Sequence, residues 1–318
     1  MIQVLGPQRP TPNAPACLEE FGGEGTILVL SAGWRHEETD DEALRRHLGP
    51  DVVVLPLYTW FEVVMKELPE LRAAYRARQD DWIRMRQLHR LRLTPALDVV
   101  RNLWAEGTTT EDLVMRRELE AAMDHVRALD VQLCDHVTAI RAAHAETIDA
   151  QKGHKVVAKM VKKAMKAVAD ARVVVIPGGH VAVLLNRIRF FGVDQALAQR
   201  HADGGNIVAW SAGAMILTER VVLFYDDPPD GPSHPELLGP GLGLVEDLVL
   251  LPHARQRLRL EESDRVALLA QRMSPTSCIG LENGARLARD EGEWVNQADP
   301  HTAVRLETDG RVPCLRCL

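Results

Sequence analysis

The sequence predicts an α/β protein whose mostly parallel sheet is covered by helices on both faces, with a large all-helical insertion. Short continuous runs of valine, isoleucine and leucine alternate with helical segments, which is typical of buried parallel strands. Residues 67–170 show helical periodicity and no strand signal. Ser211 lies directly between an apolar run and a helix, at the edge of the sheet where open α/β folds place their sites.

Four apolar runs predict the strands of the sheet. They are Thr26–Ser31, Asp51–Pro56, Ala171–Ile176 and Asn206–Trp210. The first two enclose a short helix and make a β-α-β opening. A segment rich in proline and glycine follows the fourth run, and shorter strands are expected after it at Leu248–Leu251, Ser277–Leu281, Ala285–Ala288 and Ala303–Leu306. We therefore expect residues 1–66 and 171–318 to form the α/β core.

Residues 67–170 are expected to form a helical insertion that serves as a lid or as an oligomerisation layer. Thr94 followed by Pro95 predicts the start of a helix, and Gly107 predicts its end. Another helix begins near Thr110 and keeps an apolar stripe for many turns. Such a stripe needs a packing partner, so the helices also predict a homo-oligomer.

The end of the insertion is a basic amphipathic helix. Six lysines between Lys152 and Lys166 surround an apolar face that contains Val157 and Val161. The pattern fits the solvated face of a packed helix, or a surface that contacts an acidic partner or nucleic acid.

Composition limits the function classes. The 318 residues contain 38 Lys and Arg against 45 Asp and Glu, a formal charge of −7, which makes a nucleic-acid partner unlikely. No apolar run approaches the roughly 20 residues needed to span a bilayer, and residues 1–20 do not resemble a signal peptide. A cytoplasmic protein without a membrane partner is expected.

The five cysteines are scattered and odd in number, which favours free thiols over a disulfide framework. Cys314 and Cys317 form a Cys-x-x-Cys pair near the end of the chain. With no second pair nearby, they are half of a zinc site, a redox pair, or a pair without function. We expect no metal or organic cofactor.

The sequence Trp-Ser-Ala-Gly at residues 210–213 places Ser211 where a strand turns sharply into a helix. This turn is typical of a nucleophile elbow, in which the amide of Ala212 and the helix dipole stabilise an oxyanion. Gly213 removes the side chain from the most crowded point. Elbows usually carry a glycine two residues before the serine, and Ala209 occupies that position. The alternative is that Ser211 only caps the helix.

A nucleophilic serine needs a base and a second oxyanion donor. His253 is the candidate base among twelve histidines, because it follows an apolar strand and so lies at a strand end. Gly178 and Gly179 provide two amides without side chains between another strand and the next helix. These two glycines could also form a plain turn or an anion site at a helix N-terminus.

These three segments, Pro177-Gly-Gly-His-Val-Ala-Val-Leu-Leu185, Ala209-Trp-Ser-Ala-Gly-Ala214 and the stretch from Gly241 to His253, resemble the peptidase E and cyanophycinase family, which is peptidase S51-like. Its members are serine peptidases on a class I glutamine amidotransferase-like fold. The resemblance implies that Ser211 is the nucleophile and His253 the base. It also implies that Gly178, Gly179 and Ala212 form the oxyanion hole.

The third member of the triad departs from the family pattern. The family takes a glutamate from a loop after the next strand, and alignment places Asn283 there, with Glu282 one residue earlier. Either could accept a hydrogen bond from the imidazole. We favour Glu282, with Asp226 as a reserve acid. Cyanophycinases also carry an Asp-Gln pair before the histidine, and Leu251 and Pro252 stand there, which argues against cyanophycin as the substrate.

Substrate contacts are expected from three segments. Trp34, Arg35 and Glu38 lie on the loop after the first predicted strand. His180 lies on the glycine loop, by which we mean residues 177–180. The resemblance implies further substrate contacts on the segment after His253, where a guanidinium fork suits a carboxylate. They come from Arg257 and Arg259.

The function expected from these features is that of a serine hydrolase, dipeptidase-like, which cleaves a small peptide or related amide through an acyl-enzyme on Ser211. The alternative is a non-catalytic or regulatory protein that uses its helical insertion to bind a partner or itself. A glutamine amidotransferase would need a cysteine at the elbow, and none of the five lies there.

Overall fold

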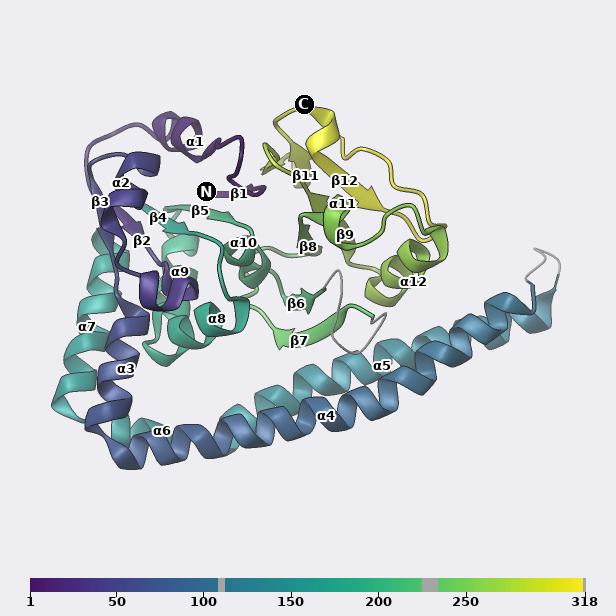
Figure 1. Cartoon of the computed structure of the whole chain (residues 1–318), viewed down its shortest axis with the longest axis horizontal. Coiled ribbons are helices and arrows are strands. Elements are labelled where there is room, and N and C mark those ends of the chain that lie inside the picture. The colour runs from purple at the N-terminus through teal and green to yellow at the C-terminus, as the bar shows by residue number, and fades with distance from the viewer. Residues whose placement is uncertain (108–111, 225–233, 317–318) are drawn as a thin grey trace.

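The computed structural model describes residues 1–107, 112–224 and 234–316. In this part of the chain an α/β core lies above a long pair of helices, one end of which extends beyond the core (Figure 1). The main sheet has seven strands in the order β11-β10-β1-β5-β4-β2-β3. The pairs β1–β5, β5–β4, β4–β2 and β2–β3 are parallel, whereas β10 runs antiparallel to β1 and to β11. The predicted fold class is therefore confirmed.

The strands of the main sheet are short and mostly buried. Their bounds are β1 Ile2–Leu5, β2 Ile27–Val29, β3 Val52–Val54, β4 Val173–Ile176, β5 Asn206–Trp210, β10 Arg286–Asp290 and β11 Glu293–Asn296. Two small sheets accompany it, with the orders β12-β9-β8 and β6-β7. Their strands are β6 Arg220–Leu223, β7 Glu236–Pro240, β8 Leu248–Pro252, β9 Ser277–Leu281 and β12 Ala303–Leu306.

Helices cover both faces of the main sheet because alternate side chains of each strand point to opposite sides. Val173 and Val175 of β4 pack in one apolar cluster with residues of α1 (Ala14–Glu20) and α2 (Asp41–Leu48). Val174 and Ile176 of the same strand belong to the larger cluster on the other face. That cluster includes residues from α3 Leu57–Glu67, α7 Lys155–Asp170, α8 Val181–Phe190, α9 Val193–Ala202, α10 Ala212–Leu217 and α12 Ser263–Met273.

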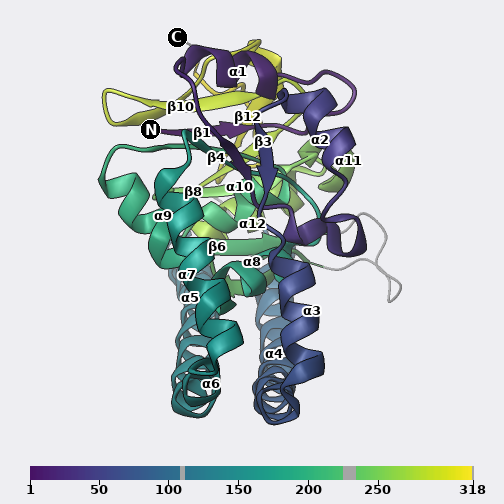
Figure 2. The ribbon, with the colours of Figure 1, turned by 90° about the vertical axis from the view of Figure 1, so that its left-hand side faces the viewer.

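The chain between β3 and β4 is helical in its described part. Helix α3 leads down to α4 (Pro69–Ala105), which pairs with α5 (Leu113–Ala143), and α6 (Ala145–Lys152) and α7 return the chain to the core (Figure 2). The helical hairpin, by which we mean α4 and α5, runs beneath the core and contacts it through β7 and α12. The division of the chain into a core and an insertion with boundaries at residues 66 and 171 stays a prediction.

Two sequence expectations about secondary structure were wrong. Helix α4 does not begin at Thr94, because it runs from Pro69 through Pro95 without a break. The preference of proline for the first turn of a helix is outweighed here by apolar packing against α5. Strand β1 was not expected, although it lies between β10 and β5 in the sheet.

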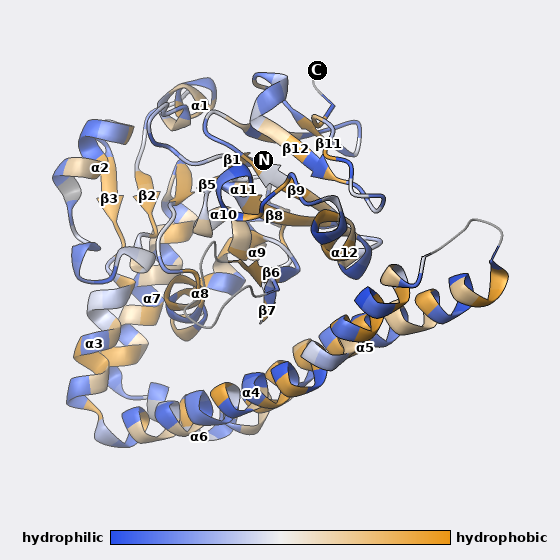
Figure 3. Ribbon diagram, turned by 45° about the vertical axis from the view of Figure 1, so that its right-hand side comes forward, coloured by the Kyte–Doolittle hydropathy of each residue, from blue (hydrophilic) through white to orange (hydrophobic). Residues whose placement is uncertain are grey.

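The helical hairpin has its own apolar seam. Leu93, Leu97 and Val100 of α4 pack against Met123 and Val126 of α5, which confirms the expected stripe on that helix. Polar and apolar side chains alternate along both helices, as expected for surface helices (Figure 3). Leu268 of α12 joins the same cluster and ties the helical hairpin to the core.

The basic helix α7 is a packed helix with a charged outer face. Val157, Ala164 and Val168 are buried, whereas Lys159 and Lys162 are exposed. The ammonium group of Lys163 lies 5.3 Å from the centre of the Trp60 ring on α3. The lysines therefore have a structural explanation that needs no acidic partner.

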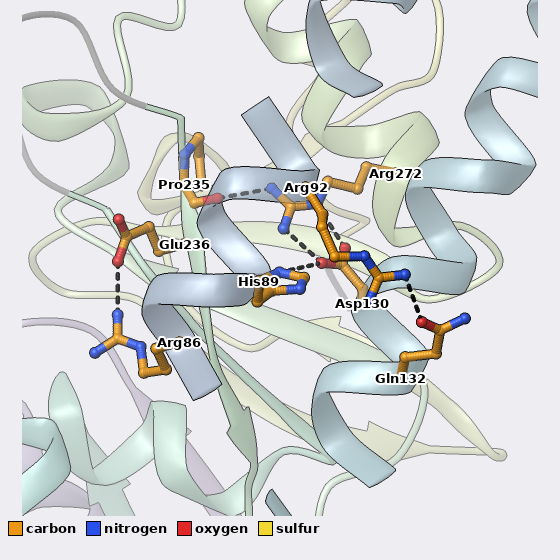
Figure 4. Close-up of polar contacts among 8 residues, drawn as sticks. All are labelled: Arg86, His89, Arg92, Asp130, Gln132, Pro235, Glu236 and Arg272. Carbon is orange, nitrogen blue, oxygen red and sulfur yellow. Dashed lines mark hydrogen bonds and ion pairs between the residues drawn. The ribbon is translucent and has the colours of Figure 1, made fainter. Parts of the chain in front are cut away.

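A buried charge network fastens the helical hairpin to the core (Figure 4). Arg272 of α12 donates two hydrogen bonds to the carboxylate of Asp130 on α5, at 2.6 and 2.7 Å. Its remaining amino group donates to the Pro235 carbonyl at 2.7 Å. A second, partly exposed ion pair joins Arg86 of α4 to Glu236 of β7, with 2.6 Å between the guanidinium nitrogen and the carboxylate oxygen. Four segments distant in sequence are thus held together by polar contacts.

Candidate active site

Ser211 occupies a strained backbone position between β5 and α10. Its φ of 52° and ψ of −123° lie in a region that residues with a side chain rarely adopt. The helix that follows is wholly buried. A Cβ atom on Gly213 would lie 1.9 Å from the Ile176 carbonyl oxygen, so the sharp turn needs glycine at that point. This backbone is that of a nucleophile elbow, and no side-chain hydrogen bond from Ser211 caps the helix.

The glycine loop after β4 lies directly against the serine. A Cβ atom on Gly178 would be 2.9 Å from the Ser211 Cβ and 3.1 Å from its Oγ. Because Gly178 has no side chain, backbone can approach the hydroxyl closely. Gly178, Ser211 and Ala212 are therefore brought together, with Gly179 next to Gly178 in the loop, and their role as an oxyanion hole stays a prediction.

The loop after β2 meets the same place. The N–H of His180 donates to the Gly33 carbonyl at 2.8 Å, and Gly179 adopts a φ of 126°. A Cβ atom on Gly179 would lie 2.6 Å from the Gly33 carbonyl carbon, so a side chain at this position would force the backbone of one of the two loops to shift. The role of Gly33 in closing this contact was not anticipated, although a glycine directly after an apolar strand is a signal for it.

Arg35 and His180 lie close enough to influence each other. The pKa of His180 is lowered by burial and then by the Arg35 guanidinium. A neutral imidazole is therefore favoured at neutral pH. The Arg35 side chain is exposed, and its backbone is strained with a φ of 59°. Trp34 is half-buried and packs against the cluster beneath α1 and α2.

His253 follows β8 and begins the short helix α11 (Ala254–Arg257). Its backbone is left-handed, with a φ of 60°, and its N–H donates to the Leu281 carbonyl at 2.8 Å. This hydrogen bond ties His253 to the end of β9, directly before Glu282. Helix α10, which Ser211 begins, packs against β8, the strand that leads to His253. The elbow and the candidate base thus belong to adjoining elements.

Glu282 and Asn283 point to different partners. The Glu282 carboxylate accepts a hydrogen bond from the backbone N–H of Arg255 at 2.7 Å, two residues after His253. The Asn283 amide accepts from the Thr11 N–H at 2.9 Å and donates to the Pro7 carbonyl at 2.7 Å. Asn283 therefore fastens the N-terminal loop, whereas Glu282 reaches the segment that follows His253.

The remaining candidates are placed differently. Asp226 and Cys317 lie outside the described residues. Arg257 is exposed on α11. Arg259 pairs with Glu262 at 3.2 Å and lines a cavity of about 680 Å³ with residues of α4 and α12. Among the described residues lining that cavity, none belongs to the elbow or to the glycine loop.

Glu38 does not face a substrate cleft, which corrects the sequence expectation. Its side chain is fully buried and accepts hydrogen bonds from the backbone N–H groups of Tyr58 at 2.7 Å and Thr59 at 2.8 Å. These are unpaired donors at the start of α3, so Glu38 caps that helix from a distant loop. Burial raises the pKa of its carboxyl group.

The described residues contain neither a cluster of metal-ligating side chains nor a helix that could span a membrane. No group of three or more His, Cys, Asp or Glu side chains there could hold a metal ion. Cys314 contacts His301, with 3.5 Å between Sγ and Nδ1. No helix of residues 1–107, 112–224 and 234–316 is long and apolar enough to cross a bilayer.

Comparisons with known proteins were made against families, curated proteins and solved structures. The model of peptidase family S51 matches residues 128–296, a range that contains Gly178, Ser211, His253 and Glu282. No curated protein matches the sequence.

Two solved structures are similar at low identity. A peptidase from an acI-B1 Actinobacterium is 16% identical over 71% of this chain and 88% of its own, with a TM-score of 0.38. A candidate peptidase E protein from Listeria monocytogenes EGD-e is 16% identical over 44% of this chain and 65% of its own, with a TM-score of 0.33. The family match covers more than half of the 318 residues, and the chain belongs to peptidase family S51.

Proposed function

We propose that the protein is a serine peptidase that cleaves a small peptide or related amide through an acyl-enzyme on Ser211. The observation that carries this proposal is the backbone of Ser211, with φ 52° and ψ −123°, against which Gly178 packs. A helix cap does not require strained backbone, whereas a nucleophile elbow does. The strain at Ser211 therefore supports the role of a nucleophile.

In the proposed mechanism, the Ser211 hydroxyl attacks the substrate carbonyl while His253 accepts its proton. The tetrahedral oxyanion is held by backbone N–H groups of the glycine loop and of Ala212 at the start of α10. His253 then returns the proton to the leaving amine, and an acyl group stays on Ser211. Water attacks this ester with His253 as the base, which releases the acid and restores the serine.

Glu282 is the favoured third member of the triad. Its carboxylate already lies at the first turn of α11, where it accepts from the Arg255 N–H. A rotation of this carboxylate toward His253, two residues before Arg255, would let it accept the imidazole N–H and stabilise the imidazolium. Asn283 is engaged elsewhere by two hydrogen bonds, to Thr11 and Pro7.

Substrate recognition is proposed for the rim formed by Trp34, Arg35 and His180, with Arg257 and Arg259 as further candidates. Gly33 and His180 share a hydrogen bond of 2.8 Å, so this rim is part of the same loop cluster as Ser211. The exposed guanidinium of Arg35 suits the carboxylate of a peptide.

The test combines labelling with kinetics on the full chain. A fluorophosphonate probe should label the parent protein, and Ser211→Ala should abolish the label and the hydrolysis of a dipeptide panel. Ser263→Ala, which removes an exposed hydroxyl at the start of α12, is the matched control and should retain both.

Dipeptide hydrolysis by Ser211→Ala at the parent rate would overturn the serine mechanism. A parent protein that neither reacts with the probe nor cleaves any panel member would instead favour the alternative, a non-catalytic protein that binds partners through its helices.

A further inference from the structure

A large cavity lined by described residues is separate from the elbow. It has a volume of about 910 Å³ and lies between the helical hairpin, α6, α7, α8 and β7. Neither Ser211, His253 nor the glycine loop contributes to its lining. A cavity of this size accommodates a small organic molecule.

Three guanidinium groups line this cavity from different helices. Arg78 comes from α4, Arg141 from the last turn of α5, and Arg189 from the last turn of α8. Lys152 and Lys162 add two ammonium groups, whereas Asp149 and Asp194 are the acidic residues of the lining. The cavity is therefore strongly positive although the whole chain carries a charge of −7.

The two acidic residues offset only part of the positive charge of the lining. The Asp194 carboxylate acts against the lowering of the pKa of Arg141 and Arg189, and one of its oxygens is buried without a hydrogen-bond partner among the described residues. Asp149 pairs with Lys152 at 3.3 Å. Within the described part of the chain, none of the three guanidinium groups has a carboxylate oxygen within 4.0 Å. Arg189 donates to the carbonyls of Pro240 at 2.9 Å and Gly241 at 2.7 Å, which fixes its position without adding a negative charge.

The arginines are close enough to repel one another. The pKa of Arg189 is lowered to about 10, first by burial and then by the guanidinium of Arg141, while Asp194 opposes the shift. The pKa of Arg141 is lowered by burial; Asp194 opposes this shift, and Arg78 makes a smaller contribution that lowers the pKa. Gathering like charges in a partly buried place costs free energy, and a bound anion would remove that cost.

The lining also contains apolar side chains. Trp82, Ile148, Val161, Leu185 and Phe190 contribute side chains to it. The Lys152 ammonium lies 5.0 Å from the centre of the Phe190 ring, where the charged and apolar parts of the lining meet. A ligand that fits both parts has an anionic group at one end and an apolar body at the other.

We propose that this cavity binds a small phosphorylated organic molecule, with its phosphate among Arg78, Arg141 and Arg189 and its organic part against the apolar wall. Guanidinium groups bind phosphate oxygens through paired N–H donors, and three of them match a group with two negative charges better than a single carboxylate does. The inference does not depend on the chemistry proposed for Ser211.

The experiment uses the full chain with phenyl phosphate as the probe. Calorimetry should show that phenyl phosphate binds and raises the unfolding temperature, and that it binds more tightly than inorganic phosphate or benzoate. Benzyl alcohol, which keeps the ring without the charge, should not bind. Arg141→Gln should weaken phenyl phosphate binding about 10- to 100-fold, because it removes a charged donor. Without ligand, this variant should unfold at or above the parent temperature, since repulsion is relieved.

The matched control is Arg117→Gln, which makes the same change on an exposed arginine of the same helix, about 36 Å away at 1.5 Å per residue. It should bind as the parent does. Arg78→Gln is the second test variant and should also weaken binding.

Three outcomes would overturn the proposal. They are a parent that does not bind phenyl phosphate, binding that neither variant weakens, and benzoate binding as tightly as phenyl phosphate. Variants that unfold below the parent in the absence of ligand would show instead that the arginines stabilise the free protein.

Discussion

Arg272 and Asp130 form a bidentate ion pair in which both side chains are nearly inaccessible, at 2% and 0% exposure. The pair joins α12 to α5 at a point where the helical hairpin meets the core. Arg272 outweighs the burial of the acid, so that the pKa of Asp130 is lowered. His89 of α4 lies 3.5 Å from the same carboxylate and adds a third helix to the contact.

Removing one member of this pair should be strongly destabilising. We expect Asp130→Ala to reduce the free energy of unfolding by about 3–5 kcal/mol, because it leaves the Arg272 charge buried without a partner. Urea denaturation measures the change. Asp124→Ala on the same helix is the control, since its pair with Arg127 is exposed and should contribute at most about 1 kcal/mol. If the two variants lost equal free energy of unfolding, the larger contribution of the buried ion pair would be contradicted.

Gly178→Ala should inactivate the proposed peptidase while leaving its fold intact. The new methyl group would lie 2.9 Å from the Ser211 Cβ and must displace the serine or the loop. We expect a fall of about 10²-fold or more in kcat/KM for dipeptides, as for the loss of an oxyanion donor. Gly153→Ala, where the new atom meets its nearest neighbour at 3.3 Å, is the control. Unchanged kinetics in Gly178→Ala would separate the glycine loop from catalysis.

Glu282 and Asn283 can be distinguished by variants that keep the side-chain size. Glu282→Gln should lower kcat by about 10²–10⁴-fold, because the charge that stabilises the imidazolium is lost. Asn283→Ala should leave kcat near the parent value and loosen the loop at Pro7 and Thr11, with faster backbone hydrogen exchange there. The reverse pattern would assign the triad position to Asn283.

His234 should make folding stability sensitive to acid. Burial, followed by the Arg101 guanidinium, lowers the pKa of His234 to about 4. The unfolded chain binds this proton near the ordinary histidine pKa of about 6.5, whereas the folded protein does not. The contribution of neutral His234 to the free energy of unfolding is therefore complete above the ordinary histidine pKa of about 6.5. This contribution is lost as the pH falls toward 4.

We expect His234→Gln to flatten the dependence of the unfolding free energy on pH within this interval. The exposed His201 provides the control substitution, His201→Gln. A slope that His234→Gln leaves intact would show that other groups cause the acid sensitivity.

Self-association stays a prediction that the helical hairpin makes testable. Leu91 of α4 and Val114 of α5 are each 71% exposed, so both side chains are accessible to a second copy of the chain. Light scattering should give a mass above the 35.4 kDa monomer, and Leu91→Glu with Val114→Glu should reduce it. Arg84→Glu, an exposed change on α4, should not. A monomer at every concentration would contradict the prediction.

The central strands could be predicted because their residues are almost all β-branched or aliphatic. The predicted bounds of two strands agree with the structure to within two residues. These strands are β4, Val173–Ile176, and β5, Asn206–Trp210. Strand β1 escaped because the polar Gln3 interrupts its apolar run. Gln3 is buried in the structure and accepts a hydrogen bond from Arg286, a long-range contact that no local pattern indicates.

The proximity of Gly178 and Ser211 was predictable, because both follow neighbouring parallel strands, and such strand ends meet at one edge. Glu38 illustrates the limit of that reasoning. It also follows a strand, but its carboxylate turns inward to the start of α3, since unpaired N–H groups of Tyr58 and Thr59 are available there. The position of a residue after a strand indicates that it lies at the edge of the sheet. It does not decide whether its side chain faces the site or turns into the interior.

The ion pair between the helical hairpin and the core also restricts how this protein could have changed over evolutionary time. A shortened descendant that lost α4 and α5 would leave Arg272 without Asp130, and Leu268 without its apolar neighbours. Loss of the helical hairpin would therefore expose a surface of α12 that now faces other helices, so it calls for compensating substitutions at positions 268 and 272.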